Sequence, residues 1–185
     1  MMAQKSCPIC LDPMSSPRSL ECKHSFCVEC IQTALNVCNR CPVCQQPQGI
    51  ITGNQPRGQM TFYTDRNGVP GYEGYGKIVI SYQFPSGVQG SEHPNPGQHY
   101  QGTSRTAYLP DNHEGRQVLQ FLRRAFDARL VFTVGTSNTT GLSNQVIWND
   151  IHHKTSISGG PYGFGYPDPG YLQRVKEELA TKGIR

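Results

Sequence analysis

Cys7-Pro-Ile-Cys10 and Cys41-Pro-Val-Cys44 bracket the stretch of sequence that decides how the first part of this chain folds. Zinc takes four nitrogen or sulfur ligands, and a Cys-x2-Cys knuckle lets two thiolates reach one ion from a single turn. Eight potential ligands therefore predict two tetrahedral zinc sites. In order, they are Cys7, Cys10, Cys22, His24, Cys27, Cys30, Cys41 and Cys44.

The spacing of the central ligands predicts how they pair. Neighbouring ligands in Cys22-x-His24-x2-Cys27 lie too close together for all of them to serve the same ion, so the pairs should interleave. We expect one site to contain Cys7, Cys10, Cys27 and Cys30, and the other to contain Cys22, His24, Cys41 and Cys44.

This order of seven cysteines and one histidine resembles the RING finger of ubiquitin ligases. Ile9 and Pro42 match the family's apolar platform for the ubiquitin-conjugating enzyme. Cys38-x2-Cys41 is a rival pair, but Cys41-Pro-Val-Cys44 matches the family's final knuckle. The alternative is another eight-ligand zinc module, of the kind that binds histone tails or braces a fold.

Composition indicates two domains, a RING over residues 1–47 and a globular domain over residues 48–185. All eight cysteines lie between Cys7 and Cys44, a pattern that a reducing cytoplasm or nucleus favours for metal ligation. Residues 1–44 contain few large apolar side chains, so metals must fold them. The Gly/Gln/Pro-rich residues 45–58 are typical of a linker.

Charge and hydropathy exclude several classes of partner. Seven thiolates and two zinc ions reduce the formal charge of +4 to about +1, which gives little support for nucleic-acid binding. The chain has no apolar run long enough for a membrane span, and its start lacks the apolar run of a signal peptide. We therefore expect a protein of the cytoplasm, the nucleus or both, without a membrane partner.

Periodicity predicts an α+β fold for the second domain, with a mixed sheet. Residues 77–84, 130–134 and 145–148 are rich in β-branched and aromatic residues and are expected to form strands. Residues 114–129 place apolar side chains at helical spacing, and residues 169–182 form a second predicted helix between a possible Asp168 cap and Gly183. The apolar positions of the first helix are Val118, Phe121, Leu122, Ala125 and Phe126.

Seven runs of the second domain are similar to the C-terminal domain of Deltex ubiquitin ligases. They are Gly53-Asn-Gln-Pro, Pro70-Gly-Tyr, Glu92-His-Pro-Asn-Pro-Gly, Tyr108-Leu-Pro-Asp-Asn, Phe132-Thr-Val-Gly-Thr-Ser, Trp148-Asn-Asp-Ile-His-His-Lys-Thr and Gly165-Tyr-Pro-Asp-Pro. The ending, Glu177-Glu178-Leu-Ala-Thr-Lys-Gly, resembles the Deltex 3 and Deltex 3-like branch.

The Deltex resemblance implies a pocket for ADP-ribose and NAD. It also implies that the ligase attaches ubiquitin to ADP-ribose, either free or on ADP-ribosylated proteins, and that an ADP-ribosyltransferase is a possible partner. Because no cysteine follows Cys44, ubiquitin should pass directly from the conjugating enzyme to its acceptor. Many RING fingers carry an arginine after the last ligand, whereas this chain has Gln45 there.

Glu178 is the first of several candidate site residues in this pocket. It projects onto the inward face of the last helix, beside Tyr171 and Val175, and matches the family's catalytic glutamate. We expect it to accept the proton of a ribose hydroxyl. A carboxylate at the edge of that face could also reach water or pair with a core residue.

The remaining candidate residues are expected to contact the ligand. The motif match favours His152 as a ligand-binding residue, although a histidine here could also lie in the core. Trp148 can pack in the core or line the site, and Gly135, Thr136, Ser137 and Asn138 could cradle a diphosphate. Phe164 stands where the family usually has histidine or tyrosine. It can stack on a ring but cannot carry a proton, so Tyr162 or Tyr166 is the candidate substitute.

Three functions are compatible with these residues. The first is a RING ligase that directs ubiquitin to ADP-ribose. The second keeps the ligase but makes the pocket a reader of ADP-ribosylated proteins. The third uses NAD to ADP-ribosylate ubiquitin, with the same carboxylate.

Overall fold

A computed structural model describes residues 5–185, and the chain folds into two compact units. The first comprises the residues up to Ile51 together with Thr181–Ile184, and the second comprises Thr52–Ala180 with Arg185. Among the described residues, no helix is both long and apolar enough to cross a membrane. The boundary that we place between residues 47 and 48 stays a prediction.

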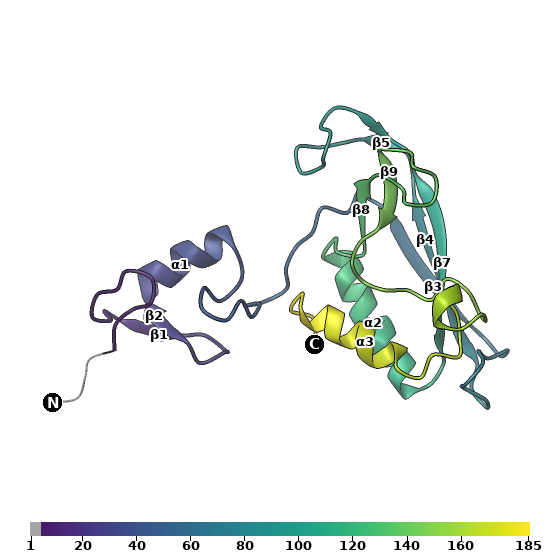
Figure 1. Ribbon diagram of the computed structural model, residues 1–185, viewed down its shortest axis with the longest axis horizontal. Helices are drawn as coiled ribbons and strands as arrows, with labels where there is room; N and C mark the ends of the chain where they lie inside the picture. Colours follow the sequence, from purple (N-terminus) through teal and green to yellow (C-terminus); the bar gives the residue numbers. More distant parts are fainter. Residues whose placement is uncertain (1–4) are drawn as a thin grey trace. The chain divides into compact units, whose positions relative to one another are not determined.

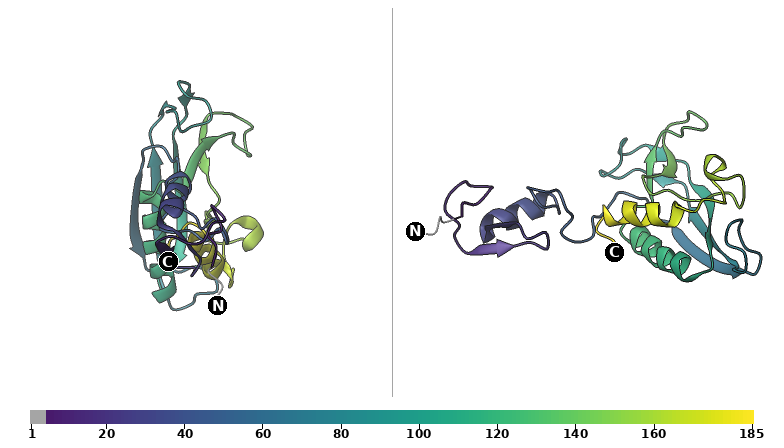
Figure 2. Two further views of the ribbon diagram at one scale, coloured as in Figure 1. Left: turned by 90° about the vertical axis from the view of Figure 1, so that its left-hand side faces the viewer. Right: turned by 60° about the horizontal axis from the view of Figure 1, so that its bottom comes forward.

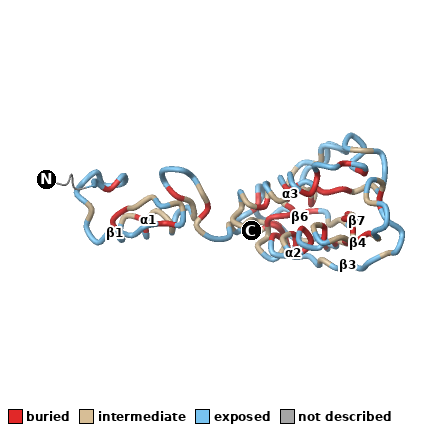
Figure 3. The backbone as a smooth tube through the Cα atoms, turned by 90° about the horizontal axis from the view of Figure 1, so that it is seen from below, coloured by how far each residue is buried: buried red, intermediate tan, exposed pale blue. Residues whose placement is uncertain are grey.

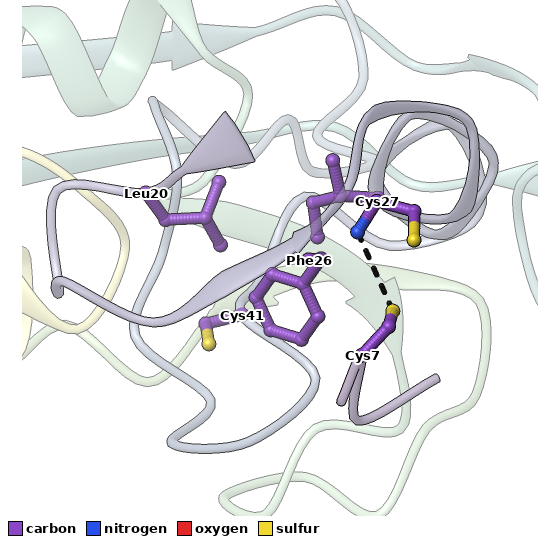
Figure 4. Close-up of a cluster of buried hydrophobic side chains, with 6 residues drawn as sticks. Cys7, Leu20, Phe26, Cys27 and Cys41 are labelled. Atoms are coloured by element: carbon purple, nitrogen blue, oxygen red, sulfur yellow. Dashed lines mark hydrogen bonds between the residues drawn. The ribbon is translucent and has the colours of Figure 1, made fainter. Parts of the chain in front are cut away.

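The first unit has little regular structure and a small core. A hairpin of β1 (Pro17–Ser19) and β2 (Ser25–Cys27) leads directly into α1 (Val28–Val37). Figure 4 shows the buried cluster, in which Leu20 and Phe26 lie among cysteine side chains. Its buried members are Cys7, Leu20, Phe26, Cys27, Ile31 and Cys41. Half of this core thus consists of predicted zinc ligands.

The second unit is built on a three-stranded antiparallel sheet in the order β3-β4-β7 (Figure 1). Its strands are β3 (Gln59–Asp65), β4 (Lys77–Phe84) and β7 (Thr103–Pro110). The predicted central strand, residues 77–84, is confirmed. β3 is an edge strand whose residues are mostly exposed, as Figure 3 shows.

Two helices complete the core of this unit, and Figure 2 shows them lying side by side. The helix α2 (His113–Asp127) begins after Asn112, whose side chain accepts a hydrogen bond from Gly115 N at 2.7 Å. It packs against β7, and the helix predicted over residues 114–129 is confirmed. Of the predicted apolar face, Phe121 and Phe126 are only half-buried, whereas Leu119, which was not predicted, is buried.

The last helix, α3 (Tyr171–Ala180), is shorter than predicted. Pro169 lies in a turn before it, and Asp168 does not cap it through its side chain. That carboxylate instead accepts hydrogen bonds from Lys154 Nζ and Arg174 Nη2, both at 2.6 Å. Gly183 follows the helix as expected, with a φ of +80° that favours glycine.

Two short strand pairs lie among the loops of the second unit. The strands β8 (Phe132–Gly135) and β9 (Gln145–Trp148) pair antiparallel, as do β5 (Gly87–Val88) and β6 (His99–Tyr100). A single 3-10 turn, η1 (Pro161–Gly163), lies in the last long loop. The named ladders among residues 5–185 are antiparallel, and the parallel pairing of the second unit is confined to the isolated bridges Gln101–Gln145 and Ser158–Tyr166.

The predicted linker over residues 45–58 is only partly a linker. Gln55 is buried within the second unit, where its Oε1 accepts from Phe132 N at 3.0 Å and its Nε2 donates to Phe126 O at 3.3 Å. Gly53 N also donates to Ala128 O at 2.8 Å. These bonds make Gly53 and Gln55 part of the domain, because buried polar groups need partners.

Candidate metal centres and ligand cavity

The eight predicted zinc ligands gather into two groups in the first unit. One group is Cys7, Cys10, Cys27 and Cys30, and the other is Cys22, His24, Cys41 and Cys44. Within each group the possible ligand atoms lie within 4.8 Å of one another. Four soft donors at this separation fit a tetrahedral zinc ion. The chain therefore contains two Cys/His zinc-binding sites in the interleaved arrangement.

Backbone amides favour the thiolate form of Cys7 in the first group. Cys27 N donates to Cys7 Sγ at 3.4 Å, the bond drawn in Figure 4, and Ser15 N donates to Cys27 Sγ at 3.3 Å. Desolvation raises the pKa of Cys7, but backbone N–H groups of Cys10, Cys27 and Ile9 outweigh it and lower that pKa to about 6. A thiolate is the form that binds metal.

The two residues predicted to contact a conjugating enzyme are both exposed. Ile9 lies in the first knuckle and is 39 % exposed, and Pro42 lies in the last knuckle. Leu11, which follows the first knuckle, and Val43, within the last one, are exposed as well. Each knuckle thus presents apolar atoms to solvent. Cys38 is exposed and belongs to neither ligand group among the residues described.

A cavity of about 420 Å³ in the second unit brings several candidate residues together. This volume lies within the usual range for small-molecule sites, roughly 300–1,000 Å³. Its walls come from β7, β9 and the loops after β8 and β9. The lining residues are Arg105, Thr139, Trp148, Asn149, Ile151, His152, His153, Thr155 and Phe164.

Aromatic packing fixes the inner wall of the cavity. Phe132 and His153 both stack on Trp148 with ring centroids 4.3 Å away, and Tyr82 meets Trp148 edge-on. Phe132 and Trp148 are partners across the β8–β9 ladder, so the strands hold this stack in place. Trp148 therefore both packs in the core and lines the cavity, the two roles left open by the sequence.

His153 is the core histidine of the pair. Its Nδ1–H donates to Ile151 O at 2.9 Å, so its Nε2 accepts from the Tyr82 hydroxyl at 2.9 Å. Burial lowers the pKa of His153 to about 4, which keeps the ring neutral. His152 differs, because its side chain is 77 % exposed.

Helix α3 holds His152 at three points. Glu178 Oε2 accepts from His152 N at 2.9 Å, and Glu178 Oε1 accepts from His152 Nδ1 at 2.5 Å. The Tyr171 hydroxyl donates to His152 O at 3.1 Å. Because the carboxylate accepts from Nδ1, the ring presents Nε2 as its other nitrogen. Glu178 thus pairs with a residue that lines the cavity, and is 26 % exposed in its side chain.

A buried ion pair anchors the segment that carries His152. Lys154 Nζ and Asp168 Oδ2 lie 2.6 Å apart, with side chains only 6 % and 4 % exposed. Burial raises the pKa of Asp168, but hydrogen bonds from Arg174 and Lys154 outweigh it and hold that pKa below its usual range. Asp168 follows the loop that carries Phe164. The pair therefore ties together two chain segments that form walls of the cavity.

The cavity contains three of the predicted ligand residues and leaves out four. Trp148, His152 and Phe164 line it, and Phe164 is 62 % exposed at a φ of +54°. Of the loop expected to cradle a diphosphate, Thr139 lines the cavity. The four residues outside its lining are Gly135, Thr136, Ser137 and Asn138.

Neither tyrosine proposed to replace a proton carrier at position 164 lines the cavity. Tyr166 is fully buried and its hydroxyl donates to Tyr108 O at 2.9 Å. Tyr162 is fully exposed on the turn η1. A role for either tyrosine in carrying a proton stays a prediction.

Sequence reasoning missed Arg105, Asn149 and Thr155 as lining residues. A signal for Arg105 existed in the alternation of residues 103–110. Arg105 shares its face of β7 with Ala107 and Leu109, which are both buried. A charged residue on the core face of a strand is a candidate for a site.

Two family models match this chain. The Deltex C-terminal domain matches residues 52–184, and the C3HC4-type zinc finger (RING finger) matches residues 6–44. Fold and sites thus define a RING finger joined to a Deltex C-terminal domain.

The chain belongs to the Deltex family. It is 57 % identical over 184 residues to "Probable E3 ubiquitin-protein ligase DTX3" of Homo sapiens, an alignment that covers 98 % of this chain and 53 % of that protein. The values for the Mus musculus protein of the same name are the same. "E3 ubiquitin-protein ligase DTX1" of Homo sapiens is 43 % identical over 170 residues, 88 % of this chain and 27 % of that protein. The chain spans about half the length of its DTX3 relatives.

Proposed function

We propose that this chain is a RING-type ubiquitin ligase whose second unit binds ADP-ribose and directs ubiquitin to it. The observation that carries the proposal is the cavity lined by Trp148, His152 and Phe164, with Glu178 hydrogen-bonded to His152. Aromatic rings suit an adenine base, and the paired carboxylate suits proton removal. The names of the DTX1 and DTX3 relatives support the ligase activity.

The zinc module supplies the first half of this function. Its two metals hold the knuckles in place, and Ile9 and Pro42 present an apolar surface for a ubiquitin-charged conjugating enzyme. Such a module acts by positioning the ubiquitin thioester for attack. Gln45 lacks the charge of an arginine at this position, so the module's own hold on ubiquitin is weak.

The cavity supplies the acceptor. A ribose hydroxyl attacks the carbonyl carbon of the thioester, a C–O bond forms, and the C–S bond to the conjugating enzyme breaks. Glu178, together with the His152 ring that it contacts, takes the hydroxyl proton. The leaving thiolate receives a proton in turn. ADP-ribosylated proteins are acceptors by the same chemistry, and an ADP-ribosyltransferase would supply them.

Phe164 favours one alternative, a pocket that only reads ADP-ribose. Its ring can stack on a base but cannot move a proton, and neither Tyr162 nor Tyr166 lines the cavity in its place. A reader would recruit ADP-ribosylated proteins while ubiquitin goes to their lysines.

The test is transfer of labelled ADP-ribose to ubiquitin in the presence of activating enzyme, conjugating enzyme and ATP. We compare the natural sequence with Glu178→Ala, and use Glu177→Ala as a matched control. Glu177 is a neighbouring exposed carboxylate whose Oε1 accepts from Gln173 and does not contact His152. We expect label on ubiquitin except with Glu178→Ala.

The outcomes separate the candidate functions. Lysine ubiquitination without any labelled ubiquitin would mean that the cavity only recognises ADP-ribosylated proteins and that ubiquitin is not transferred to ADP-ribose. Label that enters ubiquitin from NAD, but not from ADP-ribose, would favour ADP-ribosylation of ubiquitin. Equal label with Glu178→Ala and Glu177→Ala would remove Glu178 from the reaction.

A further inference from the structure

The strand β3 forms one edge of the three-stranded sheet, and its outer side is open. It pairs with β4 alone, and within residues 5–185 none of its backbone groups bonds to another segment. The opposite edge is partly covered, because Tyr108 N of β7 donates to Lys154 O at 2.8 Å. Alternate residues of an edge strand direct N–H and C=O groups outward. Residues Gln59–Asp65 therefore offer a row of backbone donors and acceptors that a further strand can use.

β3 lacks the features that usually keep an edge strand from pairing. It contains no proline or lysine, and it pairs with β4 residue by residue without a bulge. The side chains of Phe62 and Tyr63 are 45 % and 59 % exposed and lie on opposite faces of the strand. The one charged residue of β3, Asp65, lies at its end and is bonded to Lys77 Nζ at 2.7 Å. An added strand would thus meet apolar contacts on both faces.

Three exposed arginines surround this edge. Arg57 lies two residues before β3, and Arg66 follows it directly. The guanidinium carbon of Arg123, on α2, lies 5.6 Å from the centroid of the Phe62 ring. No ion pair found among residues 5–185 includes any of the three. The edge therefore carries positive charge near both ends and near its middle.

We propose that β3 is a docking edge for an extended acidic segment of another protein, which adds to the sheet as a fourth strand. Backbone hydrogen bonds supply the pairing, and carboxylates of the segment meet the three arginines. No residue of β3 lines the cavity, so the inference does not depend on the ligand proposed for that cavity. In a ubiquitin ligase, such an edge holds proteins that are to receive ubiquitin.

The charges disfavour a second copy of this chain as the occupant. Two antiparallel strands related by a two-fold axis place the start of one beside the end of the other. Centred on Phe62, such a pairing sets Arg66 of each strand opposite Gly58 of the other, one residue from its Arg57. Like charges then face each other at both ends of the pair, which is destabilising. An acidic segment has the complementary charge at the same places.

The test uses the zinc-loaded full chain and three fluorescein-labelled synthetic peptides. The first alternates valine with glutamate over about ten residues, enough to span β3 at about 3.4 Å per residue. The second replaces every glutamate by lysine, and the third replaces the central valines by proline, which cannot donate to a ladder. The protein variant is Arg123→Glu. Its matched control is Arg124→Glu on the same helix, where the Arg124 side chain donates to Arg185 O at 2.6 Å.

We expect fluorescence polarisation to show binding of the glutamate peptide, with the lysine and proline peptides at least about ten-fold weaker. Arg123→Glu should weaken the glutamate peptide about five- to ten-fold, and Arg124→Glu should change its affinity less than about two-fold. Added salt should weaken binding to the natural sequence. In NMR spectra the amide signals of Gln59–Asp65 should shift, and alternate amides among them should become protected from hydrogen exchange.

Four results would overturn the inference. The first is no binding of the glutamate peptide, and the second is equal binding of the lysine or proline peptide. The third is a set of shifted amides that surrounds the cavity and leaves β3 unchanged. The fourth is protection of β3 amides that rises with protein concentration without any peptide, which would make a second copy the occupant. None of these results affects transfer of labelled ADP-ribose to ubiquitin, so the proposed function is tested separately.

Discussion

The two units of this chain are stabilised by different interactions. The first buries three large apolar side chains, Leu20, Phe26 and Ile31, among cysteines that form its zinc groups. The second buries a continuous core from β4, β7, α2 and α3. A short segment cannot bury enough apolar surface to offset its conformational entropy, so metal ligation must contribute the missing free energy. The stability of the first unit should therefore depend on zinc, and that of the second on the packing of its apolar core.

Removing zinc should give the largest effect and should act on one unit only. Structural zinc contributes on the order of 10 kcal/mol to the folding of small metal domains. We expect a strong chelator to collapse the NMR amide signals of the first unit while those of residues 52–180 persist. Metal analysis should find two zinc ions per folded chain. Loss of signals throughout the chain would contradict the comparison.

A cysteine pair tests the same point by substitution. Cys44→Ala removes a ligand of the second group, whereas Cys38→Ala removes an exposed thiol outside both groups. Cys44→Ala should lower the zinc content to about one ion per chain and abolish discharge of a conjugating enzyme. Cys38→Ala should leave both unchanged. The reverse result would mean that Cys38-x2-Cys41 is the true final knuckle.

Acid should destabilise the second unit through His153. Its pKa of about 4 in the folded chain lies below the ordinary value of 6.5. The unfolded state therefore binds this proton more tightly. The contribution of His153 to the free energy of unfolding is complete above pH 6.5 and is lost as the pH falls towards 4. The loss amounts to roughly 3 kcal/mol. Urea denaturation between pH 7 and 4 should show a smaller loss for His153→Gln than for the natural sequence.

Tyr171→Phe should have a smaller effect that is concentrated at the site. It removes the hydrogen bond from the Tyr171 hydroxyl to His152 O. We expect a loss of about 1–2 kcal/mol in unfolding free energy. Because His152 is then held only by Glu178, transfer to ADP-ribose should slow while the affinity for ADP-ribose stays the same. Single-turnover rates at saturating ADP-ribose measure this slowing. An unchanged rate would contradict the role of Tyr171.

Phe164→Ala should have the smallest effect on stability. The ring is 62 % exposed, so its loss should change the unfolding free energy by less than about 0.5 kcal/mol. Binding of ADP-ribose should weaken several-fold if the ring stacks on the ligand, a contact worth about 1 kcal/mol. Titration of Trp148 fluorescence measures this change. An unaltered affinity would place Phe164 outside the ligand contacts.

The sequence predicted the features that depend on local spacing. The zinc groups follow from the intervals between ligands in a short segment, and helical periodicity alone placed Glu178 on the inner side of α3. The strand over residues 77–84 was recognisable because it is rich in β-branched and aromatic residues. These signals lie within a few residues of one another.

Features that depend on distant parts of the chain were missed. β3 is an edge strand with mostly exposed residues and lacks a clear alternation, and the first half of β7 is polar. Gln55 looks like a linker residue until its amide meets backbone groups 71 and 77 residues away. The alternation of residues 103–110 marks Arg105 as unusual, but its neighbours in the cavity could not be predicted, because they come from β9 and from loops in separate parts of the chain.

The most direct test of the whole account is the intact mass of ubiquitin after reaction. Ubiquitin, activating enzyme, conjugating enzyme, ATP and ADP-ribose are incubated with the zinc-loaded chain, with the chelated chain and with Glu178→Ala. Ubiquitin should gain one ADP-ribose less one water, through an ester that hydroxylamine cleaves, only with the zinc-loaded natural sequence. A gain that survives chelation or Glu178→Ala, or no gain while lysine chains form, would contradict the claim that the metal module and the cavity complete one reaction.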